Sequence, residues 1–130
     1  MKPKKIWANL GVKDVDQTTK FYNALGFKFN GHGNAKELVS FSIGNDDFVV
    51  NFFANDTLNK AMEGTLSDPK QGNEIMFTLS AENKDEVNAW AGEVRNAGGN
   101  IFSEPAEFGQ GYYGFSFADP DGHKWNVFYM

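Results

Sequence analysis

The chain has 130 residues, of which 41% are hydrophobic and 22% charged, and its net charge is −5. This composition fits one soluble globular domain with a core, and the acidic balance argues against a nucleic-acid-binding face, because no basic cluster exceeds Lys2, Lys4 and Lys5. The absence of cysteine excludes disulfide scaffolds, thiolate zinc sites and cysteine nucleophiles.

The first half of the chain, about 4–54, predicts a strand, a capped helix and three further strands. Asp14 precedes a helical pattern and Gln17 follows three residues later, which is the spacing of a capping box. Gly26 suits the end of this helix, because glycine adopts positive φ without strain. "GNDD" at 44–47 is typical of a hairpin turn. Strands are expected at about 27–31, 36–43 and 47–54.

The segment 55–72 is polar, contains Pro and Gly, and is interpreted as a linker with a short helix near 57–63. The second half, about 73–130, then repeats the plan of the first. Asn83 and Glu86 form the second capping-box pattern, and the helix that follows is about four residues longer than the first, close to one turn. "DPDG" at 119–122 is the matching turn. Strands are expected at about 100–104, 111–118 and 123–129.

The repeated order βαβββ predicts an α+β fold with two tandem modules. Each module would form a curved four-stranded sheet with a helix on its back. A lone sheet of this size leaves apolar surface wet, so the two modules must cover each other's open faces. We therefore expect a single domain over 1–130, with a half-open, barrel-like sheet around a cavity.

Two stretches, "VKDVDQTTKFYNALGF" near the start and "GFSFADPDGHKWNVFY" at the end, resemble the vicinal oxygen chelate superfamily of glyoxalases, bleomycin-resistance proteins and extradiol dioxygenases. The opening "IWANLGVKD" followed by "FYNALGFKFN" is most similar to bacterial glyoxalase-related proteins of the lactoylglutathione lyase type. The resemblance covers nearly the whole chain. It implies a homodimer. In some members of the superfamily, the two chains of the dimer share the cavity.

Metal-using members of the superfamily hold one divalent ion with a His or Glu from each of four strands. The resemblance implies that the corresponding positions in this chain are Trp7, Asn51, Glu74 and Asn126. An indole offers a metal no lone pair, and two amides with one carboxylate make a poor site for a dication. We therefore expect no bound metal and no other cofactor.

The same alignment predicts a polar patch. Asn9 shares the strand parity of Trp7 and would point inward with Asn51, Glu74 and Asn126. Buried amides need partners, so these groups either orient a ligand or hydrogen-bond one another or water. Trp7 either stacks on a flat or cationic ligand or fills the space that the metal ion vacated.

Aromatic residues supply the walls of the expected cavity, although strand parity alone does not say which face is inward. Tyr113, in the turn-like "GQGYYG", is expected at the cavity rim, and Phe128 shares the strand face of Asn126. The remaining candidates for walls or core are Phe48, Phe53, Met76, Tyr112, Phe115 and Phe117.

The two histidines have structural and functional interpretations. His123 shares a strand face with Trp125 rather than with Asn126, so we interpret it as a structural residue after the turn. His32, in the loop "NGHGN", is either an exposed loop residue or a general base on a loop that closes over the cavity. A metal site made of both histidines and a carboxylate is a further alternative.

These observations favour a protein that binds a small, aromatic or cationic molecule without a metal, in the manner of the bleomycin-resistance proteins. The alternative is a glyoxalase-type lyase or isomerase with a non-standard metal site or with Glu74 as general base. A third is a structural or regulatory dimer with a vestigial cavity. No signal peptide or membrane span is recognised, so a cytoplasmic protein that contacts neither membrane nor nucleic acid is expected.

Overall fold

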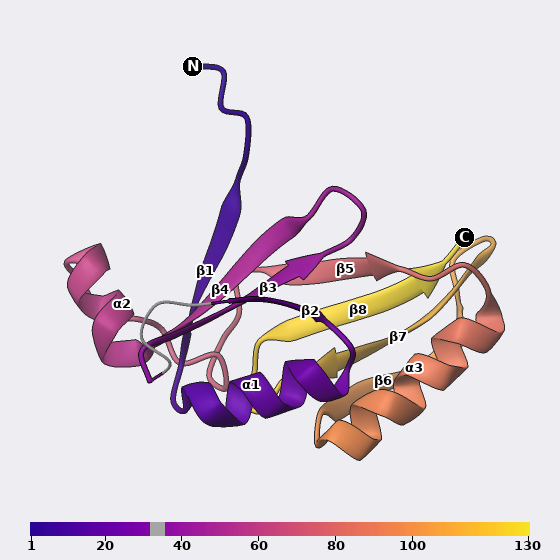
Figure 1. The fold of residues 1–130 in the computed structure, drawn as a ribbon. Coiled ribbons are helices and arrows are strands. Elements are labelled where there is room, and N and C mark those ends of the chain that lie inside the picture. The colour runs from indigo at the N-terminus through magenta and orange to yellow at the C-terminus, as the bar shows by residue number, and fades with distance from the viewer. Residues whose placement is uncertain (32–35) are drawn as a thin grey trace. The chain divides into compact units, whose positions relative to one another are not determined.

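Two four-stranded sheets, one in each half of the chain, carry the fold in the computed structural model (Figure 1). The structure describes residues 1–31 and 36–130, so His32 lies outside the described residues. The chain divides into two compact units, 1–66 and 67–130, and the boundary lies within the segment interpreted as a linker. The α+β class and the repeated βαβββ order are confirmed.

The first unit has its strands in the order β1-β4-β3-β2. β1 and β4 run parallel, whereas the other neighbours are antiparallel. α1 contacts β3 and β4, and α2 contacts β1 and β4. Its elements are β1 (Trp7–Val12), α1 (Val15–Ala24), β2 (Lys28–Gly31), β3 (Leu38–Ile43), β4 (Phe48–Ala54) and α2 (Asn55–Met62).

The second unit repeats this topology with the order β5-β8-β7-β6 and a parallel β5–β8 pair. Its helix α3 contacts β6, β7 and β8. The two sheets are therefore built alike, each with its long helix against one face. The elements are β5 (Met76–Ser80), α3 (Lys84–Ala97), β6 (Asn100–Phe108), β7 (Tyr112–Ala118) and β8 (Lys124–Tyr129).

Side-chain caps begin both long helices where the sequence predicts them. The Asp14 carboxylate accepts hydrogen bonds from the backbone N–H groups of Asp16 and Gln17 at 2.9 and 3.2 Å. Asn83 accepts the N–H of Glu86 at 2.8 Å. In a capping box the Glu86 carboxylate would accept the backbone N–H of Asn83. Here it accepts the N–H of Glu82 instead. α1 has 10 residues and α3 has 14, which confirms the extra turn.

The helix-facing side of each sheet is its core. In the first unit, the Tyr22 ring of α1 stacks on Phe52 with ring centroids 4.5 Å apart. In the second unit, Trp125 stacks on Phe117 at 6.4 Å and lies 4.7 Å from Phe77. Large apolar area is removed from water at both places, and this burial is the main stabilising contribution to each unit.

Two element boundaries differ from the sequence-based expectation. β6 continues to Phe108 instead of ending near 104, although it contains Pro105. It is an edge strand with register shifts on both sides of Ser103, and such a strand tolerates a residue without an N–H donor. α2 starts at Asn55, two residues before the expected start, because its N-cap Ala54 has no capping side chain to mark it.

Candidate ligand-binding faces of the two sheets

Each sheet has one face away from its long helix, which we call its open face. Strand pairing assigns residues to it, because directly paired residues point to the same side. On the first sheet, Asn9 pairs with Asn51, which in turn pairs with Ser40. On the second sheet the corresponding row is Thr78, Asn126 and Ser116. The structure thus places a polar row across the middle of each open face.

Each residue of the row on the first sheet takes part in a side-chain hydrogen bond. Asn51 Nδ2 donates to Asn9 Oδ1 at 2.9 Å, and Asn30 Nδ2 donates to Ser40 Oγ at 3.3 Å. Trp7 lies on the same face, two residues before Asn9, with 54% of its surface exposed. Of the two interpretations of Asn9 and Asn51, their mutual hydrogen bond favours the structural one.

The row on the second sheet contains a hydrogen-bond acceptor that has no partner among the described residues. Asn126 Oδ1 is buried, and it has no hydrogen-bond partner among the described residues. A buried polar atom without a partner costs about 1–3 kcal/mol, so most proteins satisfy such atoms. Asn126 Oδ1 is thus an acceptor on this face whose hydrogen bond the described residues do not supply.

Three aromatic side chains, Phe108, Tyr112 and Phe128, form what we call the aromatic cluster. Phe108 stacks on Tyr112 at 5.6 Å, and Phe128 meets both rings edge to face at 6.0 and 5.8 Å. Gly114 lies beneath them, where a Cβ atom would collide with the backbone oxygen of Val127 and press on Phe128 and Phe108. Phe108 and Tyr112 remain 46% and 38% exposed, so the cluster offers ring surface to a ligand.

Sequence reasoning identified Phe128 as a site residue and Tyr112 as wall or core, but it missed Phe108. The reason is that the strand containing Phe108 was expected to end before Pro105. Phe128 and Asn126 are two residues apart on β8 and share the open face, as the strand parity predicts. The structure therefore brings the free acceptor and the aromatic cluster to one face.

Tyr113 is not brought to this face. Its hydroxyl donates to Asn88 Oδ1 of α3 at 2.9 Å, and Lys84 Nζ lies 5.3 Å from its ring centroid. Because side chains alternate along β7, Tyr112 and Tyr113 point to opposite sides of the sheet. Tyr113 is thus placed against the helix, whereas its neighbour joins the aromatic cluster.

Glu74 lies outside the strand in which the resemblance implied it. β5 begins at Met76, because its partner β8 begins at Lys124, which pairs with Met76 and leaves no ladder partner before it. The residue that corresponds to Trp7, two positions before the polar row, is Met76. Glu74 is exposed and lines a groove in the second unit together with Met76 and Lys124.

The donor set does not fit the divalent ion that the resemblance implies. Trp7 supplies no lone pair for a metal ion, Met76 supplies a weak thioether, and Asn51 supplies only a neutral amide oxygen. Asn126 contributes a single neutral oxygen, which cannot replace charged or imidazole ligands. Within residues 1–31 and 36–130, no three His, Asp or Glu side chains gather as a metal-binding group.

His123 is buried and belongs to the turn before β8. Asp119 Oδ1 accepts the backbone N–H groups of Asp121, Gly122 and His123 at 2.9–3.0 Å, while its other oxygen hydrogen-bonds His123 Nδ1 at 2.9 Å. These contacts support the structural interpretation of His123. They fix the direction in which β8 leaves the turn, and so the orientation of Asn126.

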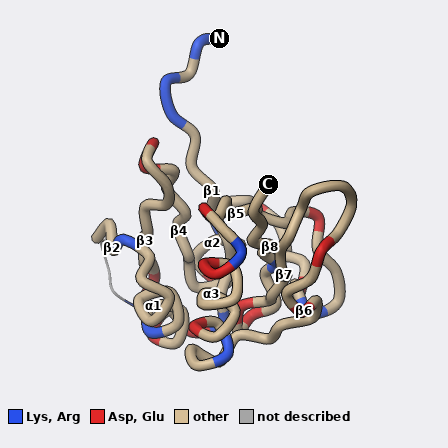
Figure 2. Tube along the Cα trace, turned by 90° about the vertical axis from the view of Figure 1, so that its right-hand side faces the viewer, with Lys and Arg blue, Asp and Glu red and all other residues tan. Residues whose placement is uncertain are grey.

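Acidic and basic positions are interleaved along the described chain (Figure 2). The Lys84–Glu107 pair beside Tyr113 is exposed, with its nitrogen and oxygen 2.7 Å apart. Its hydrogen bond and the opposite charges raise the pKa of Lys84 above its ordinary value and lower the pKa of Glu107. Exposed pairs of this kind contribute little to stability. Glu107 pairs with Tyr113 across the strands and therefore lies on the helix side of the sheet, away from the open face.

Comparison with known proteins gives a family match and a set of similar solved structures. Residues 6–127 match the model of the Glyoxalase/Bleomycin resistance protein/Dioxygenase superfamily. A hypothetical protein from S. aureus is 32% identical, with a TM-score of 0.87 and alignment over 100% of this chain and 96% of that one. No curated protein matches the chain.

More distant structures share the fold. A glyoxalase-related enzyme from Fulvimarina pelagi is 18% identical, with a TM-score of 0.85 over 98% of this chain and 89% of that one. A lactoylglutathione lyase from Agrobacterium tumefaciens is 20% identical, with a TM-score of 0.72 over 98% and 95%. None of the helices in the described part of the chain has the length and apolarity that crossing a bilayer requires.

Proposed function

The chain belongs to the Glyoxalase/Bleomycin resistance protein/Dioxygenase superfamily, and from this premise we propose that it binds a small aromatic or cationic molecule on the open face of the second sheet, without a metal ion. One observation carries the proposal: the buried, unpartnered Asn126 Oδ1 lies on the same face as the aromatic cluster. The family match confirms the resemblance inferred from the sequence.

The chemistry of this face favours a ligand with an N–H donor attached to a flat or apolar body. A ligand donor at Asn126 Oδ1 removes the cost of the unpartnered acceptor. The rings of Phe108, Tyr112 and Phe128 attract a cation by about 0.5–2 kcal/mol, and they stack on aromatic ligands. A protonated amine on an aryl group satisfies both requirements.

The alternative of a glyoxalase-type lyase or isomerase rests on Glu74. This carboxylate lines the groove of the second unit and is open to solvent, so a substrate could reach it as a base. The donor set of the open faces does not fit a metal ion, so Glu74 would act as a base without one. Ligand binding on the open face involves both Asn126 Oδ1 and the aromatic cluster, whereas the lyase alternative involves neither.

The proposed function is tested by an NMR titration of the ¹⁵N-labelled protein with 4-phenylbutylamine. The expected result is a set of shifted amide signals centred on Tyr112, Asn126 and Phe128. Asn126→Ala and Phe128→Ala should each weaken binding about five-fold or more, the effect of losing one hydrogen bond or ring contact. Asn96→Ala, on the exposed surface of α3, is the matched control and should leave binding unchanged.

Two outcomes would contradict the proposal. One is that the amine shifts no signals on the open face of the second sheet. The other is stoichiometric metal in protein purified without chelator, together with a rise of several degrees in melting temperature at micromolar Ni²⁺ or Zn²⁺. The expected homodimer and cytoplasmic location belong to the same proposal, and light scattering of the purified chain tests the first of them.

A further inference from the structure

The second unit contains a groove of about 780 Å³ at the end of its sheet where β5 and β8 begin. We call it the β5-entry groove. One wall is the segment 69–75, and the other is formed by the strand ends, including Asn100, Phe102 and Lys124. Its volume lies within the range of small-molecule sites in proteins. Its lining residues include neither Asn126 nor the aromatic cluster, so it is a separate groove, and its Met76 and Lys124 adjoin the open-face site, two residues before Thr78 and Asn126.

The wall 69–75 is fixed against the turn before β8 by specific contacts. Gly122 packs so closely on Pro69 and Lys70 that a Cβ atom would lie 3.0–3.1 Å from them. Asn73 Nδ2 donates to the carbonyl oxygen of Gly122 at 3.0 Å. These contacts form the groove before any ligand arrives, which lowers the entropic cost of binding.

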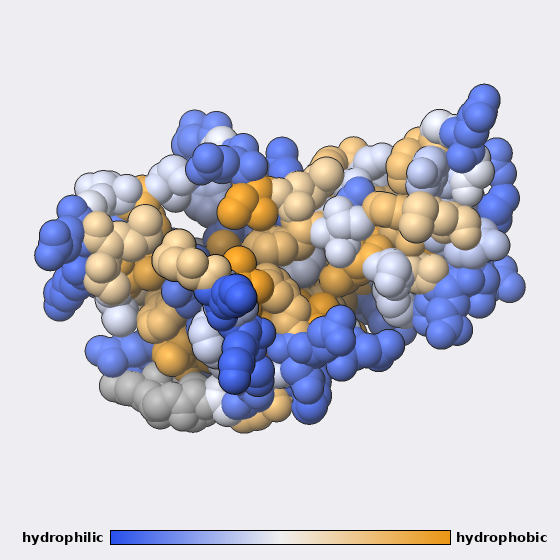
Figure 3. Space-filling view, turned by 90° about the horizontal axis from the view of Figure 1, so that it is seen from above, coloured by the Kyte–Doolittle hydropathy of each residue, from blue (hydrophilic) through white to orange (hydrophobic). Residues whose placement is uncertain are grey.

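Apolar side chains converge on this groove while remaining in contact with water. Ile75, Met76 and Phe102 are 59%, 50% and 47% exposed, although all three are large hydrophobic residues. Hydrophobic residues also lie at the surface between hydrophilic ones on the face shown in Figure 3. A group of exposed apolar side chains around a concave surface is typical of a binding site, because a ligand there releases ordered water.

The charges in the groove favour an anion. Lys124 Nζ lies 5.0 Å from the ring centroid of Phe102, and Lys70 lies in the opposite wall. Neither lysine belongs to an ion pair among the described residues. Asp119 also carries a negative charge, but its side chain is buried and its oxygens accept hydrogen bonds within the turn and from His123, so a ligand in the groove does not contact it. Glu74 is the acidic side chain left to oppose the two lysines.

We propose that the β5-entry groove is a second binding site, for a small organic anion with an apolar or aromatic body. Lys124 and Lys70 bind the carboxylate or sulfonate group, and the body packs on Phe102, Met76 and Ile75. The apolar wall adds affinity that a simple inorganic ion would lack, since the body buries apolar area. The second unit then has two sites of opposite charge preference.

The experiment compares three compounds that share one body: 4-phenylbutyrate, 4-phenylbutanol and 4-phenylbutylamine. Each is titrated into the ¹⁵N-labelled full chain, and amide shifts are followed. The acid is expected to shift signals of residues 70–76, 100–102 and 122–124, and to bind this groove about five-fold or more tightly than the alcohol, since an ion pair at a surface site adds about that factor. The amine is expected to bind the groove more weakly than the alcohol.

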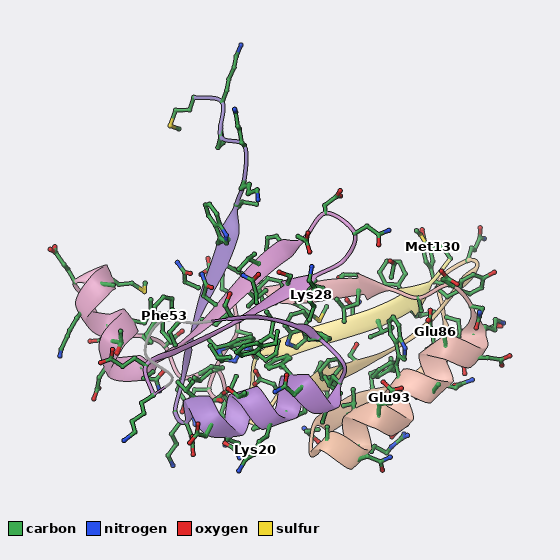
Figure 4. The ribbon with its side chains drawn as sticks, viewed as in Figure 1. Lys20, Lys28, Phe53, Glu86, Glu93 and Met130 are labelled. Carbon is green, nitrogen blue, oxygen red and sulfur yellow. The ribbon has the colours of Figure 1, made fainter. Side chains whose placement is uncertain are left out.

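Substitutions of the basic and the acidic residues in the groove should change the affinity for the acid in opposite directions. Lys124→Gln should weaken binding of the acid about five-fold, whereas Glu74→Gln should tighten it about two- to three-fold, because it removes the opposing charge. Phe102→Ala should weaken the binding of the acid and of the alcohol to the same extent. Lys20→Gln, on the outer side of α1 (Figure 4), is the matched control lysine and should change nothing.

Equal affinities of acid, alcohol and amine in the groove, or weaker binding of the acid to Glu74→Gln, would overturn the proposal. So would acid-induced shifts confined to Asn126 and Phe128. The two sites fail separately, because the amine reports on the open face and the acid on the β5-entry groove. The amide spectrum of each variant verifies that it is folded.

Discussion

The two sheets share one topology, but their open faces differ at corresponding positions. In the first sheet, Asn51 donates to Asn9, so the two facing amides are hydrogen-bonded to each other. In the second sheet, Thr78 occupies the place of Asn9, and Asn126 Oδ1 is left without a partner among the described residues. The same backbone plan thus gives one row that stabilises the sheet and another that is ready to accept a hydrogen bond.

A second difference lies two residues farther along the strands. Leu38 pairs with Phe53 in the first sheet, whereas Gly114 pairs with Phe128 in the second. A side chain at Gly114 would displace the rings above it, so glycine makes room for the aromatic cluster. Both differences place the proposed ligand-binding features in the second unit and leave the first with a more structural role.

The largest expected effect concerns the cores, where the two units should behave alike. Phe52→Ala and Trp125→Ala each remove a fully buried ring, and each should lower the free energy of unfolding by about 3–5 kcal/mol. Urea denaturation followed by circular dichroism measures both. A loss below about 1 kcal/mol in either variant would show that its core is not packed as described.

The next effect separates the two hairpin turns. Asp119 is buried and binds three backbone N–H groups, so Asp119→Asn should cost about 1–2 kcal/mol, because a neutral amide accepts these bonds less well. Asp47 in the first turn pairs with Lys28 on the surface, and Asp47→Asn should cost about 0.5 kcal/mol or less. Thermal unfolding of the two variants measures both losses of stability. Equal losses for Asp119→Asn and Asp47→Asn would contradict the expected difference.

The polar rows predict a smaller difference. Asn51→Ala breaks the bond to Asn9 and should lower the free energy of unfolding by about 1 kcal/mol. Asn126→Ala removes an oxygen that has no partner among the described residues, so its cost in the ligand-free protein should be lower, while its effect on amine binding should be large. The comparison fails if Asn126→Ala is the more destabilising of the two substitutions.

The smallest effect is a pH dependence in the second unit, at the exposed pair Lys84–Glu107. The hydrogen bond and charge of Lys84 lower the pKa of Glu107, so its contribution to stability is present above the unfolded-state pKa and is lost as pH falls through the folded value. Carboxyl-carbon NMR should show the Glu107 midpoint below the ordinary glutamate range and returning towards it in Lys84→Gln. An unchanged midpoint in that variant would mean that Lys84 is not what lowers the pKa of Glu107.

Local chemistry in the sequence determined the α+β class, the repeated βαβββ order, both helix caps and the strand face shared by Asn126 and Phe128. Caps and alternation depend on neighbours a few residues apart, so the sequence displays them directly. Only the tertiary structure decided that β6 runs through Pro105, that β5 begins after Glu74, and that Tyr113 points to α3. These features depend on which strand pairs with β5, β6 or β7. The pairing of two segments that are distant in the sequence depends on both of them, so neither segment predicts it alone.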